Sequence, residues 1–329
     1  MRDTYRAAVC TALTGPDSIS IKQLPARALR DGEVRVAVHA AGLNFPDLLM
    51  TYGKYQHRPD PPFVPGMEMA GLVIEAAADV TRFAVGDRVM GGAKGGAFAE
   101  QIVLPATALR TLPPALSFAQ GACWHVAAAT AWHALHDKAA LQPSENILIL
   151  GASGGVGMAA IKLAKHLGAN VIATASTDEK RAAVLEAGAD HALDPAADDL
   201  AAQVKALTGG AGGDVVYDPV GGDLALTATR AIAWGGRYLI VGFASGSIPN
   251  FPANHALIKG YSLIGLRAGE SARRDPALAM RSDAALAELA ARGVMRPLVS
   301  RFFALDDTRG ALRALEHRFI IGRGAVQLV

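Results

Sequence analysis

Residues 146–180 read NILILGASGGVGMAAIKLAKHLGANVIATASTDEK. The stretch opens with four aliphatic residues, 147–150, which predict a short strand buried on both faces. Glycines follow at 151, 154, 155 and 157, then an amphipathic run to residue 167 and a second β-rich run at 171–175. Strand, glycine turn, helix and strand in this order indicate the first half of a dinucleotide-binding unit. Its glycines let the backbone approach a pyrophosphate at the start of the helix.

The same turn also fits a different class of enzyme. Residues 151–155, GASGG, satisfy G-x-S-x-G, the nucleophile elbow of α/β-hydrolases, with Ser153 as the nucleophile. Gly157 favours the dinucleotide interpretation because it stands where such a turn needs a close-packing glycine, and an elbow has no use for it. Lys180 lies where an adenosine ribose would end. The hydrolase stays open as the second hypothesis.

Length, charge and cysteine content narrow the class of protein. A chain of 329 residues suggests two domains. The net charge is only +2, and the 32 basic and 30 acidic residues are interspersed, so no nucleic-acid or anionic membrane partner is expected. No apolar run is long enough to predict a membrane span. Cys10 and Cys123 are too far apart for a CxxC pair, which argues against a disulfide framework and suits the cytoplasm.

The hydrophobic pattern changes along the chain. Up to about residue 120 it is mostly β, with alternating strands and turn signals at 15–17 and 31–32. Residues 117–141 are alanine-rich and predict a helical bridge. Strands and helices then alternate up to about residue 266, including a helix at 223–233 and a strand from Arg237, which predicts a doubly wound parallel sheet. A final strand at 324–329 is expected to return to the first domain.

Several motifs together resemble a known family. They are GLNFPD at 42–47, PFVPGME at 62–68, VGDRV at 85–89, AATAWH at 128–133, GASGGVG at 151–157 and LEHR at 315–318. The chain resembles the zinc-free quinone oxidoreductase (zeta-crystallin-like) branch of the medium-chain dehydrogenase/reductase superfamily. The resemblance implies an α/β fold: a GroES-like, mostly-β domain from residues 1–122 and 269–329 around a Rossmann domain at 123–268. The cofactor is then expected in the cleft between them.

The resemblance also bears on zinc. Asn44 and Met67 stand where the zinc-dependent relatives have a cysteine and a histidine. Neither an amide nor a thioether is a plausible main zinc ligand. His133 and His136 lie three residues apart on the alanine-rich helix, where packing or surface roles are expected. We therefore predict no metal site.

Without a metal, reduction is the favoured reaction: hydride passes to a quinone or to the β-carbon of an α,β-unsaturated carbonyl, and donors must meet the negative charge on oxygen. The resemblance places Asn44 and Asp47 near the nicotinamide, and Thr130 on its ribose or carboxamide. Tyr55 is the candidate phenolic donor, although it could equally be a loop aromatic that closes the pocket. Asp47 could equally be an N-terminal helix charge.

The cofactor is predicted to be NADPH. The strand at 171–175 lacks the acidic end that accepts a ribose 2′-hydroxyl, and Ser176 and Lys180 suit a 2′-phosphate instead. The resemblance adds Arg318 at the same phosphate. It also implies cofactor contacts from Thr130, Ser153, Gly154, Gly155, Val156, Gly242 and Phe243.

Two further expectations come from the resemblance. The last strand of the Rossmann sheet, at 261–266, is expected to pair with its twin in a homodimer. Some relatives bind NADPH without turnover, so a non-catalytic NADPH-binding protein remains a third hypothesis. Among substrates, a quinone, enal, enone or enoyl thioester all remain open.

Overall fold

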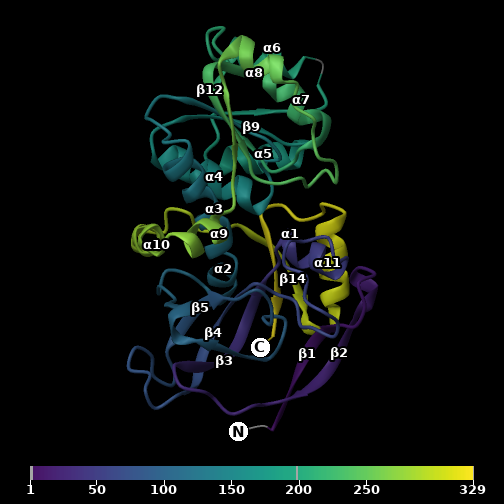
Figure 1. Cartoon of the computed structure of the whole chain (residues 1–329), viewed down its shortest axis with the longest axis vertical. Helices are drawn as coiled ribbons and strands as arrows, with labels where there is room; N and C mark the ends of the chain where they lie inside the picture. Colours follow the sequence, from purple (N-terminus) through teal and green to yellow (C-terminus); the bar gives the residue numbers. More distant parts are fainter. Residues whose placement is uncertain (1–2, 198, 329) are drawn as a thin grey trace. The chain divides into compact units, whose positions relative to one another are not determined.

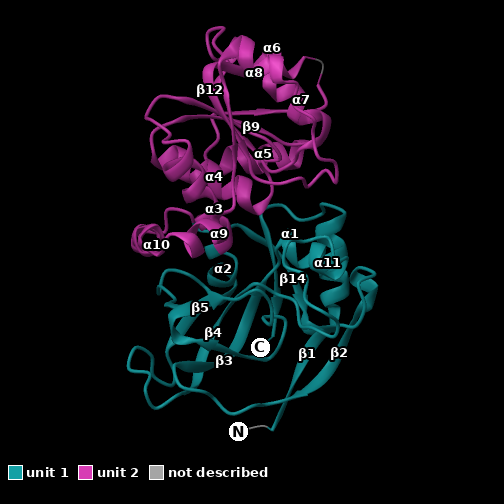
Figure 2. Ribbon diagram, in the orientation of Figure 1, with its two compact units in different colours: residues 1–125, 296–329 teal, residues 126–295 magenta. Residues whose placement is uncertain are grey.

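The computed structural model describes residues 3–197 and 199–328. The chain divides into two compact units: Met1–His125 with Arg296–Val329, and Val126–Met295 (Figure 2). The sequence places these divisions at 122 and 269. The division in the structure falls later because the two helices that follow the last strand of the second unit, at 268–291, belong to that unit.

The first unit is mostly β, as the alternating pattern predicts (Figure 1). Its strands are β1 (Thr4–Cys10), β2 (Ile19–Pro25), β3 (Glu33–Gly42), β4 (Glu68–Ala76), β5 (Arg88–Gly92), β6 (Gln101–Pro105), β7 (Leu109–Thr111), β14 (Val299–Ala304) and β15 (Arg323–Gln327). Its helices are α1 (Phe45–Thr51), α2 (Phe118–Ala122) and α11 (Thr308–Glu316), with short 3-10 turns η1 (Pro16–Ser18), η2 (Ala106–Ala108) and η4 (Leu305–Asp307).

A seven-stranded sheet forms the body of this unit. Its order is β14-β15-β3-β4-β5-β7, with β6 on β3, while β1 and β2 form a separate antiparallel pair. The terminal strand β15 runs antiparallel to β3, with Ala325 opposite Gly42, so the end of the chain completes this sheet. The core contains Val34, Val36, Val38 and Phe98, all fully buried.

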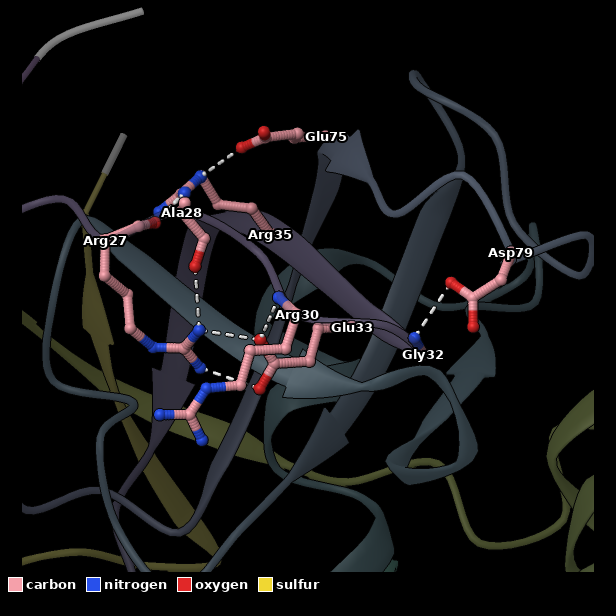
Figure 3. Close-up of polar contacts among 8 residues, drawn as sticks. All are labelled: Arg27, Ala28, Arg30, Gly32, Glu33, Arg35, Glu75 and Asp79. Carbon is pink, nitrogen blue, oxygen red and sulfur yellow. Dashed lines mark hydrogen bonds and ion pairs between the residues drawn. The ribbon is translucent and has the colours of Figure 1, made fainter.

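Ion pairs fix the loop between β2 and β3 (Figure 3). The Arg27 guanidinium donates to both carboxylate oxygens of Glu33, at 2.6 and 2.7 Å, and lowers the pKa of that carboxyl to about 2. Arg35, which is buried, donates to Glu75 at 2.7 Å and to the Arg27 carbonyl. The backbone N–H of Gly32 donates to Asp79. These contacts hold the loop to two neighbouring strands.

The second unit alternates strands with helices. Its strands are β8 (Asn146–Ile149), β9 (Asn170–Thr174), β10 (His191–Leu193), β11 (Gly213–Asp218), β12 (Ile232–Ile240) and β13 (Ser262–Gly265). Its helices are α3 (His125–Trp132), continued by the π-helical segment η3 (His133–Lys138), then α4 (Gly155–His166), α5 (Asp178–Glu186), α6 (Leu200–Leu207), α7 (Gly222–Ala231), α8 (Ala253–Lys259), α9 (Ala268–Arg274) and α10 (Pro276–Ala291).

All six strands of this unit are parallel, in the order β10-β9-β8-β11-β12-β13. The predicted doubly wound Rossmann sheet is therefore confirmed. The chain first moves from β8 towards β10 and then starts again at β11 on the other side of β8. Ligands of such sheets bind at this reversal of direction, outside the carboxyl ends of β8 and β11.

One strand begins earlier than its sequence suggests. The pattern predicts a helix at 223–233 and a strand from Arg237, but β12 starts at Ile232. Its pairing with β11 shifts between Gly213–Ile232 and Val215–Arg237, so the segment between them bulges out of register. Gly235, at a φ of 69°, permits this bulge, which leaves Trp234 exposed.

Among the described residues, no helix combines the length and apolar character that crossing a membrane requires.

Candidate dinucleotide site and the buried polar cluster

The glycine turn begins directly after β8. The Leu150 N–H donates to the carbonyl of Tyr217, which joins the end of β8 to β11. Gly151 has a φ of 53°, which favours glycine, and its N–H donates to the Thr174 hydroxyl at 3.2 Å. The Ala152 N–H donates to the Thr174 carbonyl at 2.9 Å. Backbone and side-chain bonds from both neighbouring strands thus define the turn.

Gly157 is required by packing. An ideal Cβ built on it would lie 2.6 Å from the carbonyl oxygen of Ala152, closer than any real Cβ contact. Helix α4 therefore approaches the end of β8 at a distance that only glycine allows. This is the packing role that the sequence predicts for it.

The start of α4 offers backbone donors. Gly154 is the N-cap residue and has no side chain to cap the helix. Gly155 and Val156 open a helix of 12 residues, and no described side chain accepts from its first N–H groups. Such a terminus suits an anionic group. Ser153 is half-buried beside it, and no hydrogen bond of its hydroxyl occurs among the described residues. A hydrolase nucleophile would need a base within hydrogen-bond reach.

Two basic residues, Lys180 and Arg181, follow the end of β9 in the first turn of α5. Ser176 is exposed, and the Thr177 hydroxyl caps α5 by accepting from the Lys180 N–H at 3.2 Å. The guanidinium of Arg181, which the sequence analysis did not select, donates to the Ala175 carbonyl at 2.9 Å and to Asp178 at 2.5 Å.

The loop that follows β12 lies beside the loop that follows β11. The Gly242 N–H approaches the Asp218 carbonyl at 3.3 Å, and the Ala244 N–H donates to the Pro219 carbonyl at 3.0 Å. Phe243 is partly exposed on this loop. Gly242 and Phe243 therefore stand at the carboxyl ends of the strands, and their contact with a dinucleotide stays a prediction.

The helix before β8 holds Thr130 and two histidines. The Thr130 hydroxyl donates to the Val126 carbonyl at 2.7 Å, which leaves its oxygen lone pairs to accept. His133 is buried and His136 exposed, and each places Nδ1 within 3.0 Å of the Asp137 carboxylate. Within the described part of the chain, no three His, Cys, Asp or Glu side chains group as they would around a metal.

In the first unit, Asn44 belongs to a closed polar cluster. Its amide donates to Glu68 at 2.9 Å, and its carbonyl oxygen accepts from Arg323 at 2.9 Å. Arg323 also donates to Glu68 at 2.6 Å. All three residues are at least 94% buried, because their exposed fractions are 3%, 2% and 6%. The amide of Asn44 is therefore already committed to protein partners.

Asp47 lies next to this cluster, fully buried. One carboxylate oxygen accepts from the Asn44 N–H at 2.9 Å and the other from the Gly66 N–H at 3.1 Å. Burial raises the pKa of this carboxyl to about 7, and the Glu68 charge adds to that effect, while the two N–H donors and Arg323 oppose it. With Asn44 it forms a capping box at the start of α1, which corresponds to the helix-charge alternative for Asp47.

The other predicted residues of the first unit lie on its surface loops. Tyr55 is half-buried in the loop after α1, and Arg318 is exposed after α11 with a φ of 59°. A neighbouring phenol that the sequence analysis passed over, Tyr52, donates to Glu316 at 2.8 Å. The roles of Tyr55 and Arg318 stay predictions.

Thr174, Asp218 and Arg323 were missed by the sequence analysis. Each is a buried polar residue at the first or last position of a strand. A polar residue at the end of a strand is the sequence signal that could have found them, because a polar group that is buried there needs hydrogen-bond partners.

Comparison with known proteins places these features in one family. Residues 30–114 match the alcohol dehydrogenase GroES-like domain, and residues 155–283 match the zinc-binding dehydrogenase domain. A quinone oxidoreductase-like protein 2 homolog of Nematostella vectensis is 40% identical over 325 residues, which is 98% of this chain and 88% of that protein. The chain belongs to the medium-chain dehydrogenase/reductase superfamily.

Solved structures of this superfamily agree. A quinone oxidoreductase of Pseudomonas syringae pv. Tomato DC3000 matches with a TM-score of 0.89 and 31% identity, over 98% of this chain and 100% of that one. The Escherichia coli quinone oxidoreductase complexed with NADPH matches with a TM-score of 0.88 and 27% identity, over 99% of each. Within the superfamily this chain is thus quinone oxidoreductase-like, and the hydrolase hypothesis loses its support.

Proposed function

We propose that this oxidoreductase is an NADPH-dependent, zinc-independent reductase that transfers hydride to a quinone or to an α,β-unsaturated carbonyl. The observation that supports this most is the uncapped start of α4 at the reversal point of the parallel sheet, with Gly157 packed against Ala152. A pyrophosphate there would meet backbone donors and the positive end of a helix. A structural relative is described as complexed with NADPH.

Zinc independence is supported by the chemistry of the residues at the expected metal position. Asn44 offers an amide that already bonds to Glu68 and Arg323, and the neighbouring Met67 offers only a thioether. The Arg323 guanidinium neutralises Glu68 directly, so the carboxylate already has a cation beside it. These residues do not fit a zinc ion.

NADPH rather than NADH is supported by charge. The end of β9 presents Ser176 and Lys180, and no carboxylate ends the strand itself. The Arg181 guanidinium beside them is already paired with Asp178 and Asp194. When bound, NADPH supplies the hydride. The chain's own part is to hold the phosphates on backbone N–H groups, to bind the 2′-phosphate through Lys180, and to present a donor to the acceptor oxygen, for which Tyr55 remains our candidate. Thr130, whose hydroxyl already donates to the Val126 carbonyl, remains our candidate for a contact with the ribose or carboxamide. The quinone oxygen then takes its proton from a donor or from water.

The test of this proposal is titration with NADPH and NADH, followed by nucleotide fluorescence, and NADPH consumption with quinones and enones. We expect NADPH to bind more tightly than NADH, and Lys180→Ala to reduce that preference by about 10- to 150-fold, as one charge-assisted bond would. Lys205→Ala, on α6, is the matched control and should leave the ratio unchanged. Binding of NADPH without consumption by any acceptor would instead support the non-catalytic alternative, and no binding would refute the proposal.

We also propose a homodimer formed through the open edge of the second unit's sheet. Among the described residues, strand β13 pairs only with β12 and forms one edge of the sheet, and α8 packs against β12. These elements carry exposed apolar side chains: Trp234 on β12, Leu257 and Ile258 on α8 and Leu263 on β13, with Leu257 82% exposed. An open edge beside apolar side chains is self-complementary across a twofold axis.

Sedimentation equilibrium tests the dimer. Leu257→Glu with Ile258→Glu should halve the mass, whereas Met280→Glu, an equally exposed residue of α10, should not. A monomeric wild type would refute the dimer.

We also propose that the protein is located in the cytoplasm, since Cys10 and Cys123 are buried and form no disulfide.

A further inference from the structure

Asp218 makes three hydrogen bonds at the end of β11. Its Oδ1 accepts from the Val220 N–H at 2.7 Å and from the Gly221 N–H at 2.8 Å. Its Oδ2 accepts from the Tyr238 hydroxyl at 2.7 Å. Asp218 is 1% exposed and Tyr238 is fully buried, so no solvent replaces these partners. Burial raises the pKa of the Asp218 carboxyl, and the three donors oppose that rise.

These bonds determine the path of the loop that follows β11. Both Val220 and Gly221 turn their N–H groups back to the carboxylate, and Gly221 and Gly222 adopt φ values of 70° and 62°. The loop is also tied to the one after β12, because the Ser245 N–H donates to the Val220 carbonyl at 2.9 Å. The carboxylate thus holds a turn whose positive φ values glycine adopts readily.

Val220 is the part of this loop that meets the glycine turn. An ideal Cβ on Gly151 would lie 2.6 Å from Cγ2 of Val220, so the Val220 side chain packs directly on the Gly151 backbone. Gly151 and Val220 stand at the carboxyl ends of β8 and β11, the two strands between which the sheet reverses direction. The position of Val220 therefore limits the width of the crevice in which a dinucleotide would bind.

We propose that Asp218 and Tyr238 form a latch that positions Val220 against the glycine turn and so shapes the dinucleotide crevice. Both are positioning residues, because they act through the loop at residues 219–222. The consequence for binding rests on the proposed function. The latch itself is a property of the unliganded protein and is testable without any nucleotide.

The first test uses a matched pair of variants. Tyr238→Phe removes the hydroxyl that donates to Asp218. Tyr217→Phe removes the hydroxyl of an equally buried tyrosine on β11, which has no hydrogen-bond partner in the described part of the chain. In the protein without nucleotide, amide exchange at Val220 and Gly221 should accelerate about tenfold in Tyr238→Phe and stay unchanged in Tyr217→Phe. Equal exchange in both variants would overturn the latch.

The second test measures nucleotide affinity in the same proteins. Tyr238→Phe should weaken NADPH and NADH binding equally, by about 3- to 10-fold, since the latch acts on the shared turn and not on the 2′-phosphate. Asp218→Ala should weaken both more, and Asp218→Asn should recover most of the loss because it keeps an oxygen for the two N–H donors. A purely structural role would lower thermal stability in Tyr238→Phe and leave both dissociation constants unchanged, which would overturn the role in binding.

A double-mutant cycle tests whether Val220 carries the effect of Asp218 on nucleotide binding. If Asp218 acts through Val220, then Val220→Ala and Tyr238→Phe should be non-additive in their effect on the NADPH dissociation constant, and additive effects would contradict this route. Should the wild type bind neither nucleotide, the proposed function fails and the role in binding with it, while the exchange rates still decide whether the latch exists.

Discussion

Polar groups are used in opposite ways in the two units. In the first unit, Asn44, Glu68 and Arg323 are buried and bonded to one another in a ring. In the second unit, the first backbone N–H groups of α4 have no side-chain partner among the described residues, and neither do the hydroxyls of Ser153 and Ser176. The sequence motifs selected residues from both regions as candidate site residues.

The difference teaches how to separate a binding region from a polar core. A ligand-binding surface keeps donors unused until the ligand arrives, whereas a buried polar core must satisfy its own groups. By this criterion we propose that the carboxyl ends of β8 and β11 bind an anionic ligand. The ring around Arg323, whose buried Nε is the atom without a hydrogen-bond partner among the described residues of the ring, mainly supports the fold.

The largest effect is expected from Arg323→Ala. Removal of the guanidinium leaves the Glu68 and Asp47 carboxyl groups buried without their cation, which should cost roughly 3–5 kcal/mol in the free energy of unfolding. Urea denaturation measures it. The control is Arg313→Ala, which breaks an exposed ion pair with Asp17 and should change stability little. Similar losses in both variants would show that the ring is no more important than a surface contact.

Asp47 should make stability depend on pH. An unfolded aspartate titrates near 3.9, while the pKa of Asp47 in the fold is about 7. Between these values the folded state binds more protons than the unfolded state, so stability falls as pH rises through this window, by roughly 1.4 kcal/mol per pH unit. Denaturation of wild type and Asp47→Asn from pH 4 to pH 8 tests this. The variant should lack this component of the slope, and identical slopes would contradict the prediction.

The glycine turn and the start of α4 were predictable from the sequence, because the residues that indicate them lie close together along the chain. The apolar run at 147–150, the glycines and the helix that follows lie within 35 residues, and each of them sets backbone geometry directly. The parallel sheet and the mostly-β first unit followed from periodicity in the same way. The bulge at Trp234 did not, because the tertiary pairing of β12 with β11 overrode the local helical pattern.

The ring of Asn44, Glu68 and Arg323 could not be predicted from the local sequence pattern. Asn44 and Glu68 are 24 residues apart, and Glu68 and Arg323 are 255 apart, so only the pairing of β15 with β3 and of β3 with β4 brings them together. The resemblance supplied Asn44 as a site residue but not its partners. Whether a polar side chain is already bonded is a tertiary property, and it decides what remains for a ligand.

Two glycines of the turn should respond differently to alanine. Gly157→Ala would place Cβ 2.6 Å from the Ala152 oxygen and should cost about 1–3 kcal/mol in stability and abolish NADPH binding. Gly154→Ala meets no atom closer than 3.6 Å at an ordinary φ of −81°, so the fold should be unaffected. Its NADPH affinity should nevertheless fall, because a phosphate must approach that backbone. Unchanged affinity in Gly154→Ala would refute the close approach.

Ser153→Ala should have the smallest effect. The hydroxyl makes no hydrogen bond among the described residues, so its removal should leave stability unchanged and weaken NADPH binding only a few-fold through loss of one neutral contact. Fluorescence titration and NADPH consumption in the wild type and the variant measure this, with Ser144→Ala, outside the turn, as the control. If the wild type hydrolysed esters and the Ser153→Ala variant lost nearly all of that activity, Ser153 would be a nucleophile after all. The turn would then be an elbow, and the donors at the start of α4 would serve an acyl oxygen instead of a phosphate.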